Sequence, residues 1–182
     1  MDEWVDILDA DGRYTGERIL KSEAHKNGIF HPTVHIWFYT PDGEILLQQR
    51  AGIKKTFPLF WDVSVAGHVA AGEDILKGAV REVEEEIGLK ITEKVLHPIG
   101  VFKSTQPHHS GLIDCEFHHT FICPLSVSIH ALEKQKEEVE ALQLMPISFW
   151  EKDLVSTTPS LSYVPHEEVY YREVINAIRK RL

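Results

Sequence analysis

The densest group of side chains able to do chemistry lies in residues 67–89, GHVAAGEDILKGAVREVEEEIGL, which hold six carboxylates and only two Lys or Arg side chains. Three glutamates, Glu84–Glu86, follow one another directly. Carboxylates at helical spacing repel one another, at a cost of about a few tenths of a kcal/mol per pair, unless a positive charge lies among them. The stretch is therefore either an ordinary acidic surface or a site for a divalent cation, which prefers oxygen ligands.

We expect a helix over most of this stretch, because a helix sorts its side chains onto distinct faces. With each residue advancing about 100° around the axis, five apolar side chains fall in one arc and predict a face that packs on the core: Leu76, Ala79, Val80, Val83 and Ile87. Gly88 suits the left-handed conformation that often ends a helix. Gly78, which costs up to about 1 kcal/mol within a helix, indicates close packing at that point.

The glutamates divide between two faces of this helix. Glu82, Glu85 and Glu86 share an arc beside the apolar face, whereas Glu84 points away and is expected to be solvated. Arg81 lies next to Glu85 and is positioned to hold one carboxylate. Because acidic helices are common, the spacing alone favours a solvated acidic face over a cation site.

The order of these residues is more specific than their charge. Gly67 is followed after five residues by Glu73, after seven more by Arg81-Glu82, and then by VEEEIGL at residues 83–89. This pattern resembles the Nudix box, G-x5-E-x7-R-E-U-x-E-E-x-G-U with U aliphatic, at all of its constrained positions. If each fixed residue of the box occurs at roughly one position in fifteen, a chance match in one register is about 10⁻⁸. The match outweighs the preference for a plain acidic face.

Resemblance to the Nudix hydrolases implies an α/β fold, an α/β/α sandwich with a mixed central β-sheet and a loop–helix–loop that holds Mg²⁺ or Mn²⁺ against a diphosphate. The implied activity is hydrolysis of a nucleoside diphosphate linked to another group, with cations that cancel phosphate charge and acidify the attacking water. By position, Glu82, Glu85 and Glu86 would be metal ligands, supported by Glu73 and Arg81. The residue that orients or deprotonates the water would be one of these three glutamates or a later carboxylate: Glu116, Glu137 or Glu138.

The flanking segments narrow the resemblance. Residues 4 to about 120, which include VDILDADGRYTGERILKSEAHKNGIFH and LLQQRAGIKKTFPLFWDVSVAGH, are similar to the Nudix branch that contains isopentenyl-diphosphate isomerase and related hydrolases. The metal set of that isomerase implies a second site here, suited to Mn²⁺ or Zn²⁺: His25, His31, His68, Asp114 and Glu116. The same alignment implies three cations that face the diphosphate: Lys21, Arg50 and Lys54. The alternative is that the histidines are scattered over the surface and the cations are solvated.

Two departures from the isomerase favour hydrolysis over isomerisation. The isomerase moves a proton with a cysteine, and Ala66, which cannot transfer a proton, occupies that place in VAGH. The isomerases also tend to have a degraded Nudix box, whereas this box is intact. An isomerase is therefore the second hypothesis, and a non-catalytic Nudix module that senses a nucleotide is the third.

Several remaining side chains near the expected site have simpler interpretations. Exposure in loops is favoured over a substrate or metal role for four histidines: His108, His109, His118 and His119. Packing in the core is favoured over stacking on a base for three aromatic residues: Trp37, Phe60 and Trp61.

Strands dominate the middle of the chain and must position these groups. Short segments of β-branched, aromatic or alternating residues predict strands: WVDIL, HPTVHIWFYT, EILLQQR, FWDVSVAG, IGVFKST, CEFHHTFICPL and VEALQLMPI. Apolar residues at helical spacing predict a closing helix within residues 165–182: Val169, Tyr170, Val174, Ile175, Ile178 and Leu182. We expect one Nudix domain over residues 1–182, with its box at 67–89 and two helices flanking the strands.

Composition limits the class of protein further. The chain has 182 residues, 43% of them hydrophobic, which fits one domain with a sizeable core. A net charge of −9 disfavours a nucleic-acid polymer as partner and leaves a small-molecule diphosphate. No apolar run reaches the length of a membrane span, and Cys115 and Cys123 are expected to be reduced thiols, so we expect a cytoplasmic protein. The resemblance also suggests that the protein forms a homodimer, since dimers are common among such relatives.

Overall fold

Seven strands form one mixed sheet at the centre of the protein, as seen in a computed structural model that describes residues 2–182. The strand order is β5-β4-β3-β8-β7, with β6 beside β3 and β9 beside β4. The strands have these bounds: β3 His31–Tyr39, β4 Glu44–Arg50, β5 Trp61–Asp62, β6 Val65–His68, β7 His97–Pro107, β8 Ile113–Pro124 and β9 Val139–Pro146. β3 and β8 pair in parallel and β7 and β8 antiparallel, so the sheet is mixed, as predicted.

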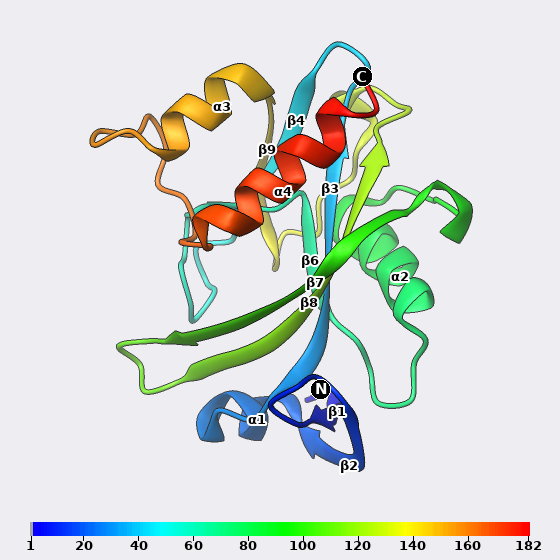
Figure 1. The fold of residues 1–182 in the computed structure, drawn as a ribbon, viewed down its shortest axis with the longest axis vertical. Coiled ribbons are helices and arrows are strands. Elements are labelled where there is room, and N and C mark those ends of the chain that lie inside the picture. Colours follow the sequence, from blue (N-terminus) through cyan, green and yellow to red (C-terminus); the bar gives the residue numbers. More distant parts are fainter. Residues whose placement is uncertain (1) are drawn as a thin grey trace.

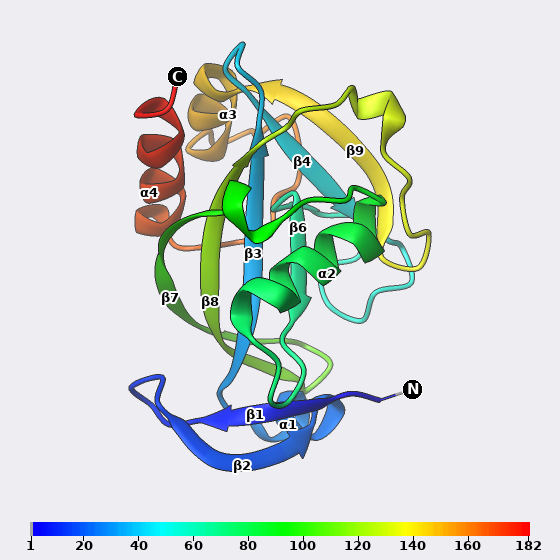
Figure 2. The same ribbon diagram turned by 90° about the vertical axis from the view of Figure 1, so that its right-hand side faces the viewer.

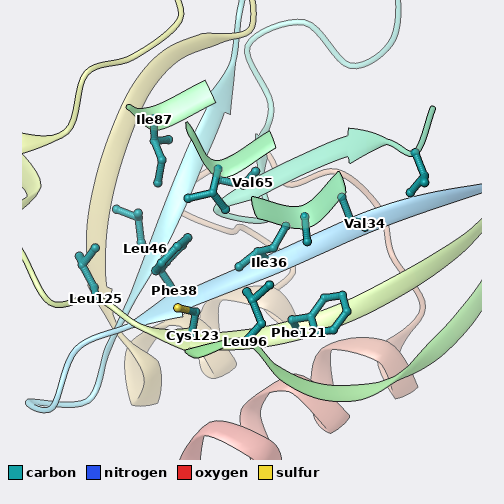
Figure 3. Packing of buried hydrophobic residues seen from close by; sticks show 13 residues of the cluster. Val34, Ile36, Phe38, Leu46, Val65, Ile87, Leu96, Phe121, Cys123 and Leu125 are labelled. Atoms are coloured by element: carbon teal, nitrogen blue, oxygen red, sulfur yellow. The ribbon is translucent and has the colours of Figure 1, made fainter. Parts of the chain in front are cut away.

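Helices cover both faces of the sheet (Figures 1 and 2). Helix α2 (Ile75–Ile87) packs on one face, where Val34, Ile36 and Phe38 of β3 lie in an apolar core (Figure 3). Helices α3 (Ile147–Leu154) and α4 (Glu168–Arg179) cover the other face, where Trp37 and Tyr39 are buried. Successive side chains of a strand point to opposite faces, so β3 contributes to both cores. The arrangement is the α/β/α sandwich that was expected.

A small layer lies at one end of the sheet (Figure 1). It consists of a two-stranded antiparallel sheet and a short helix: β1 Trp4–Leu8, β2 Tyr14–Leu20 and α1 Lys21–Asn27. Two hydrogen bonds fasten it to the loop before α2. Ala71 N donates to Trp4 O at 2.8 Å, and Gly72 N donates to Asp6 Oδ2 at 2.7 Å. The hairpin therefore lies directly beside the acidic segment.

The segment FWDVSVAG, predicted as one strand, forms the two short strands β5 and β6 instead. Side chains replace sheet hydrogen bonds between them. Asp62 Oδ1 accepts from Val63 N at 2.8 Å, and Ser64 Oγ accepts from Phe38 N at 2.9 Å. The chain can therefore leave one neighbour, β4, and join another, β3, without leaving these backbone groups unpaired.

Residues 2–182 form four α-helices, where two helices were expected. Helix α1 has seven residues and one buried side chain, Ala24, so it shows no helical periodicity in the sequence. The closing helix is confirmed as α4, and four of its six predicted apolar residues are buried: Tyr170, Val174, Ile175 and Ile178. Val169 and Leu182 are exposed. No helix within residues 2–182 has the length and apolar character needed to cross a membrane.

Asp62, buried in β5, joins three segments of the chain. Its carboxylate accepts from His166 Nε2 at 2.9 Å and from Arg50 Nη1 at 3.3 Å. Arg50 also donates to Thr56 O at 3.2 Å. Burial acts to raise the pKa of Asp62, but the hydrogen bond and charge of His166 and the charge of Arg50 hold it well below its ordinary value. An ionised carboxylate therefore fixes the loop after β4 and the segment before α4.

Asp62→Asn should lower the free energy of unfolding at pH 7 by about 3 kcal/mol, because it leaves Arg50 without its buried counter-charge. A depressed carboxyl pKa stabilises the fold fully above the ordinary pKa and less as the pH falls below about 4. The difference from wild type, measured by urea unfolding, should therefore shrink toward acid pH. Glu151→Gln, which breaks the half-exposed pair with Arg179, is the control and should cost much less. Equal losses in the two variants would contradict this role of Asp62.

Candidate active site

The acidic segment folds as a loop, a helix and a loop. Asp74 caps the start of α2 by accepting from the N–H groups of Leu76 and Lys77 at 3.0 and 3.2 Å. Gly88 ends the helix in the left-handed conformation, with a φ of 67°. Glu84 is exposed, as expected. Local sequence signals therefore set both ends of the helix.

The guanidinium of Arg81 organises the acidic side chains. It donates to both carboxylate oxygens of Glu73 at 2.9 Å. It also donates to Glu82 Oε1 at 2.8 Å and to Glu85 Oε2 at 3.0 Å. Its remaining contact is to the backbone oxygen of His68, at 2.9 Å. One planar cation, which can satisfy several acceptors at once, thus fixes the loop, the helix and the end of β6 relative to one another.

Glu73 closes the loop before α2. Its Oε2 accepts a hydrogen bond from the backbone N–H of Ala70 at 2.9 Å, in addition to the one from Arg81. A Cβ at Gly78 would lie 3.1 Å from the same oxygen, which is closer than most side-chain contacts. The glycine in mid-helix therefore leaves room for Glu73, in agreement with the close packing that the sequence indicated.

Gly67 lies where β6 passes closest to the helix. A Cβ at this position would be 2.0 Å from Cδ of Glu82 and 2.2 and 2.4 Å from its two oxygens. No side chain can occupy that space, so glycine is required for the carboxylate of Glu82 to lie against the strand.

If this segment hydrolyses a diphosphate, as the resemblance implies, Gly67→Ala should lower the rate of hydrolysis by about a hundredfold, because a displacement of roughly 1 Å at a reacting centre can cost that much. The added methyl group must push Glu82 away from the strand. Gly52→Ala is the control, since its Cβ would meet Leu59 at an ordinary 3.5 Å. Steady-state rates, with circular dichroism to check folding, compare the two variants. A Gly67→Ala protein with wild-type turnover would show that the position of Glu82 does not matter.

Glu82 and Glu86 are buried carboxylates close to like charges. Burial raises the pKa of Glu82 to about 7, although Arg81 opposes it. Burial and the charges of Glu82 and Glu138 raise the pKa of Glu86 well above its ordinary value. Glu85 differs, because its side chain is 52% exposed. The three glutamates are therefore spread from the sheet to the solvent, and a cation beside the two buried ones would lower both pKa values.

A second group of potential ligands converges beside the end of β6. One ligand atom from each of four residues lies within 4.8 Å of every other: His25, His31, His68 and Glu116. The Nε2 atoms of His25 and His68 are 3.1 Å apart. Glu116 Oε1 lies 3.6 Å from Nε2 of His31 and 3.5 Å from Nε2 of His68. The parallel register of β3 and β8, which sets His31 opposite Glu116, brings distant parts of the chain into one group.

Hydrogen bonds on the outer side turn two of these imidazoles toward the centre. His31 Nδ1 donates to Ile29 O at 2.8 Å, and His25 Nδ1 donates to Asp114 Oδ1 at 2.7 Å. Nε2 of each ring then faces the other ligands and, in the tautomer that donates through Nδ1, carries a lone pair. Nε2 of His31 is buried and has no hydrogen-bond partner among residues 2–182. A buried acceptor left unpaired in this way fits a metal site.

Asp114 is not one of these four residues but contacts one of them, His25. Its two oxygens accept from His25 Nδ1 and from His108 Nε2, each at 2.7 Å. This arrangement differs from the five-residue ligand set that the resemblance implied, because Asp114 contacts a ligand's outer nitrogen. Nothing in the sequence signals the part of His108, since its contact with Asp114 depends on the β7–β8 hairpin.

Burial and the carboxylate of Glu116 set the charges of this group. Burial lowers the pKa of His68 to about 4, although Glu116 opposes it. Burial acts to lower the pKa of His31, but the carboxylate of Glu116 beside it raises that pKa. Burial acts to raise the pKa of Glu116, but the two histidines beside it hold it well below its ordinary value. At neutral pH an ionised carboxylate thus faces a neutral His68, the protonation states that bind metal ions.

The three cations expected to face a diphosphate each have an acidic partner. Lys21 Nζ is 3.1 Å from Glu3 Oε2, Lys54 forms an ion pair with Glu138, and Arg50 makes the contact with β5 described above. The charge of Lys21 contributes to the lowered pKa of His68. The two lysines therefore lie in the surroundings of the candidate ligands, with their charges already paired.

Lys54 and Glu138 lie near Glu86, toward the C-terminal end of the acidic helix. The charge of Lys54 acts to lower the pKa of Glu86, and that of Glu138 acts to raise it. Glu137 is exposed. Of the late carboxylates considered from the sequence, Glu116 lies among the histidines and Glu138 lies near Glu86.

His118 is buried and the side chain of His108 is only 8% exposed, so their expected exposure was wrong. His118 stacks on His35 with ring centroids 4.0 Å apart, and His35 hydrogen-bonds Tyr170 Oη at 2.7 Å. The pairing of β8 with β3 causes this burial, and the sequence does not show which strands pair. Ala66 pairs directly opposite His35, so its small side chain borders a polar cluster that the sequence did not reveal.

Known proteins of similar sequence match over most of this chain. A sequence model of the NUDIX domain matches residues 29–157. The chain is 33% identical to Nudix hydrolase 3 of Arabidopsis thaliana over 99% of its own length but only 24% of that protein. It is 30% identical to an uncharacterised Nudix hydrolase of Clostridium acetobutylicum over 97% of each. It is also 35% identical to an isopentenyl-diphosphate Delta-isomerase of Halorhodospira halophila, over 66% of this chain and 67% of that protein. The chain thus spans about a quarter of the Arabidopsis relative.

Solved structures share the fold at lower identity. A crystal structure from Deinococcus radiodurans has a TM-score of 0.69 at 16% identity, covering 98% of both chains. The dihydroneopterin triphosphate pyrophosphohydrolase of E. coli has a TM-score of 0.56 at 18% identity, covering 83% of this chain and 96% of that one. At these identities the likeness shows the fold.

Proposed function

This chain belongs to the Nudix family of hydrolases, and from that premise we propose that it hydrolyses a diphosphate bond with the help of Mg²⁺ or Mn²⁺. The substrate would be a nucleoside diphosphate linked to another group, or a similar small diphosphate. The arrangement around Arg81 supports this most directly. One guanidinium holds Glu82 and Glu85, while Glu82 and Glu86 are buried with raised pKa values.

Glu82, Glu85 and Glu86 would hold the cations used in hydrolysis. Carboxylate oxygens are the ligands that Mg²⁺ and Mn²⁺ prefer. When bound, such cations cancel the charge of the diphosphate and acidify the attacking water. The raised pKa values of Glu82 and Glu86 support the binding of cations here, because a nearby positive charge stabilises the ionised form of a buried carboxyl group.

Arg81, Glu73 and Gly67 would act through these ligands as positioning residues. Arg81 orients Glu82 and Glu85, Glu73 fixes Arg81 from the loop, and Gly67 admits the carboxylate of Glu82. The group that accepts the proton from the attacking water would be one of the three glutamates or a later carboxylate: Glu116, Glu137 or Glu138.

We also propose that His25, His31, His68 and Glu116 hold a further cation, Mn²⁺ or Zn²⁺. Mixed imidazole and carboxylate ligands suit these ions. The unpaired Nε2 of His31 is the observation that supports the fit. Asp114 would orient His25 from outside, an arrangement that commonly strengthens a metal site. The resemblance also assigns Lys21, Arg50 and Lys54 to the diphosphate, and of these Lys21 and Lys54 lie near candidate ligands.

Isomerisation of isopentenyl diphosphate is the alternative that one observation favours. The four converging ligands have the residue types of the isomerase's metal set, and three relatives of 32 to 35% identity bear the isomerase name. Against this, Ala66 occupies the place of the proton-moving cysteine. Incubation with isopentenyl diphosphate should therefore yield no dimethylallyl isomer, and detection of that isomer would reverse the preference.

A panel of diphosphate compounds tests the proposed function. Nucleoside diphosphates, nucleotide sugars, dinucleotides and isoprenoid diphosphates would each be assayed with Mg²⁺ and with Mn²⁺. We expect release of a phosphorylated product from at least one class, and no release after chelation with EDTA. Tight nucleotide binding at saturating Mg²⁺ without any product would instead identify a sensing module.

A further inference from the structure

A hollow of about 510 Å³ lies between the N-terminal hairpin and the loop before α2. Figure 2 shows β1 crossing beside this loop, at the end of the sheet where the acidic helix begins. The hollow is lined by residues from both segments: Glu3, Trp4, Arg18, Ala70 and Ala71. The function proposed above uses none of these residues, so it does not explain the hollow.

Two large side chains of the hairpin are left uncovered in this hollow. Trp4 is 56% exposed, and the side chain of Arg18 is 61% exposed. Trp4 pairs with Leu20 and Asp6 pairs with Arg18 across the hairpin, so Trp4 and Arg18 lie on the same face of the small sheet. Exposing an indole to water is unfavourable, and this one is presented beside a cation.

The walls of the hollow are fixed by hydrogen bonds. The backbone of Ala71 donates to Trp4 O at 2.8 Å, and Asp6 links Gly72 N, at 2.7 Å, to Arg18 Nε, at 3.5 Å. The position of the indole relative to the loop is therefore set by backbone contacts, and a ligand would meet a surface formed in advance.

The hollow adjoins the candidate active site. Ala70 follows His68 by two residues, so their Cα atoms are at most about 7.6 Å apart. Ala70 also donates to Glu73, which holds Arg81. On the opposite wall, Glu3 is paired with Lys21, whose charge also reaches His68. A group joined to a diphosphate bound beside His68 is therefore within reach of the hollow.

We propose that this hollow binds the nucleobase of a nucleoside diphosphate substrate, with the base stacked on the indole of Trp4 and the Arg18 guanidinium beside it. This subsite rests on the diphosphate hydrolysis proposed above and names the class of substrate for it. A flat aromatic base matches an exposed indole, since stacking of a base on an aromatic side chain is favourable for any base. An isoprenoid chain would cover the indole without needing the neighbouring cation.

Binding can be measured without turnover, through the fluorescence of Trp4. Trp37 and Trp150 are buried and Trp61 is half-buried, whereas Trp4 is exposed, so a nucleotide in solution should quench mainly Trp4. Titration of the metal-free protein with AMP should give a saturable quench that Trp4→Phe removes. A quench unchanged in Trp4→Phe, or no quench, would overturn the subsite.

Kinetics give a second test with paired substrates. Trp4→Ala should raise the KM of a nucleotide sugar by about tenfold or more with little change in kcat, and leave the KM of isopentenyl diphosphate, which has no base, unchanged. Trp4→Phe should restore most of the affinity. Phe149→Ala is the matched control, because Phe149 is equally exposed, at 50%, but belongs to α3 at the far end of the molecule.

The two proposals fail in different ways. If the wild type hydrolyses nucleotides and Trp4→Ala leaves their KM unchanged, or raises the KM of both substrates equally, the subsite is wrong and the hydrolase stands. If the wild type hydrolyses no diphosphate but the AMP quench depends on Trp4, the hydrolysis is wrong and base binding stands.

Discussion

Glu86→Gln should lower the rate of diphosphate hydrolysis by about a thousandfold, since loss of a group that assists proton transfer or holds a cation typically costs two to four orders of magnitude. Glutamine keeps the size of the side chain and removes its charge. The rate at saturating Mg²⁺ and substrate, measured as released phosphorylated product, gives the effect directly.

The same substitution should not unfold the protein. Burial raises the pKa of Glu86 well above its ordinary value, so in the absence of a cation the charged form opposes folding. A raised pKa stabilises the fold below the ordinary value and loses that contribution as the pH rises. At pH 7, without added metal, Glu86→Gln should therefore unfold at the wild-type temperature or above it, as thermal unfolding by circular dichroism would show.

Glu84→Gln is the control for Glu86→Gln, because it makes the same change on the same helix at an exposed position paired with Lys90 at 3.4 Å. Its hydrolysis rate should equal that of the wild type. If the two variants lose activity equally, or if Glu86→Gln retains wild-type turnover, the acidic helix does not perform the chemistry.

His31→Asn should weaken the binding of Mn²⁺ or Zn²⁺ at the His25, His68 and Glu116 group by at least about a hundredfold. Loss of a residue that only supports a ligand already costs tenfold to a hundredfold, and this change removes a ligand atom. Asparagine keeps a donor near the place of Nδ1 for the hydrogen bond to Ile29 O, while Nε2 is lost. Isothermal titration with each metal measures the change.

The control for His31→Asn is His97→Asn, because His97 lies at the start of β7, near Arg181 and away from the ligand group. It should bind metal as the wild type does. Binding that is unaffected by His31→Asn would mean that the four side chains converge for another reason, such as packing.

Local signals explain what the sequence predicted about the site. The box residues lie within one loop and one helix, and the cap at Asp74 and the stop at Gly88 are features of single residues. The helix wheel placed Glu84 in solvent, and the cost of a glycine within a helix indicated close packing at Gly78, both as found. The same wheel could not show that Glu82 and Glu86 are buried while Glu85 is exposed, because burial depends on the sheet beneath.

What the sequence did not predict depends on pairing between distant segments. The β2 strand carries mostly exposed side chains, so no alternation marks it, and α1 is too short to show a period. The burial of His118 follows from its place opposite Thr33 in the parallel pair. Asp114 was assigned by resemblance as a ligand, and only the folded hairpin shows that its oxygens contact His25 and His108.

The parallel pairing of β3 with β8 also governs when the histidine group can form. His31 and Glu116, which face each other in that register, are 85 positions apart in the chain, and closing so long a loop is a slow, late event in folding. A nascent or partly folded chain therefore lacks the assembled side chains, and the proposed cation would bind only after the sheet is complete. Because it would bind only the folded state, it would raise the unfolding temperature as its concentration increases.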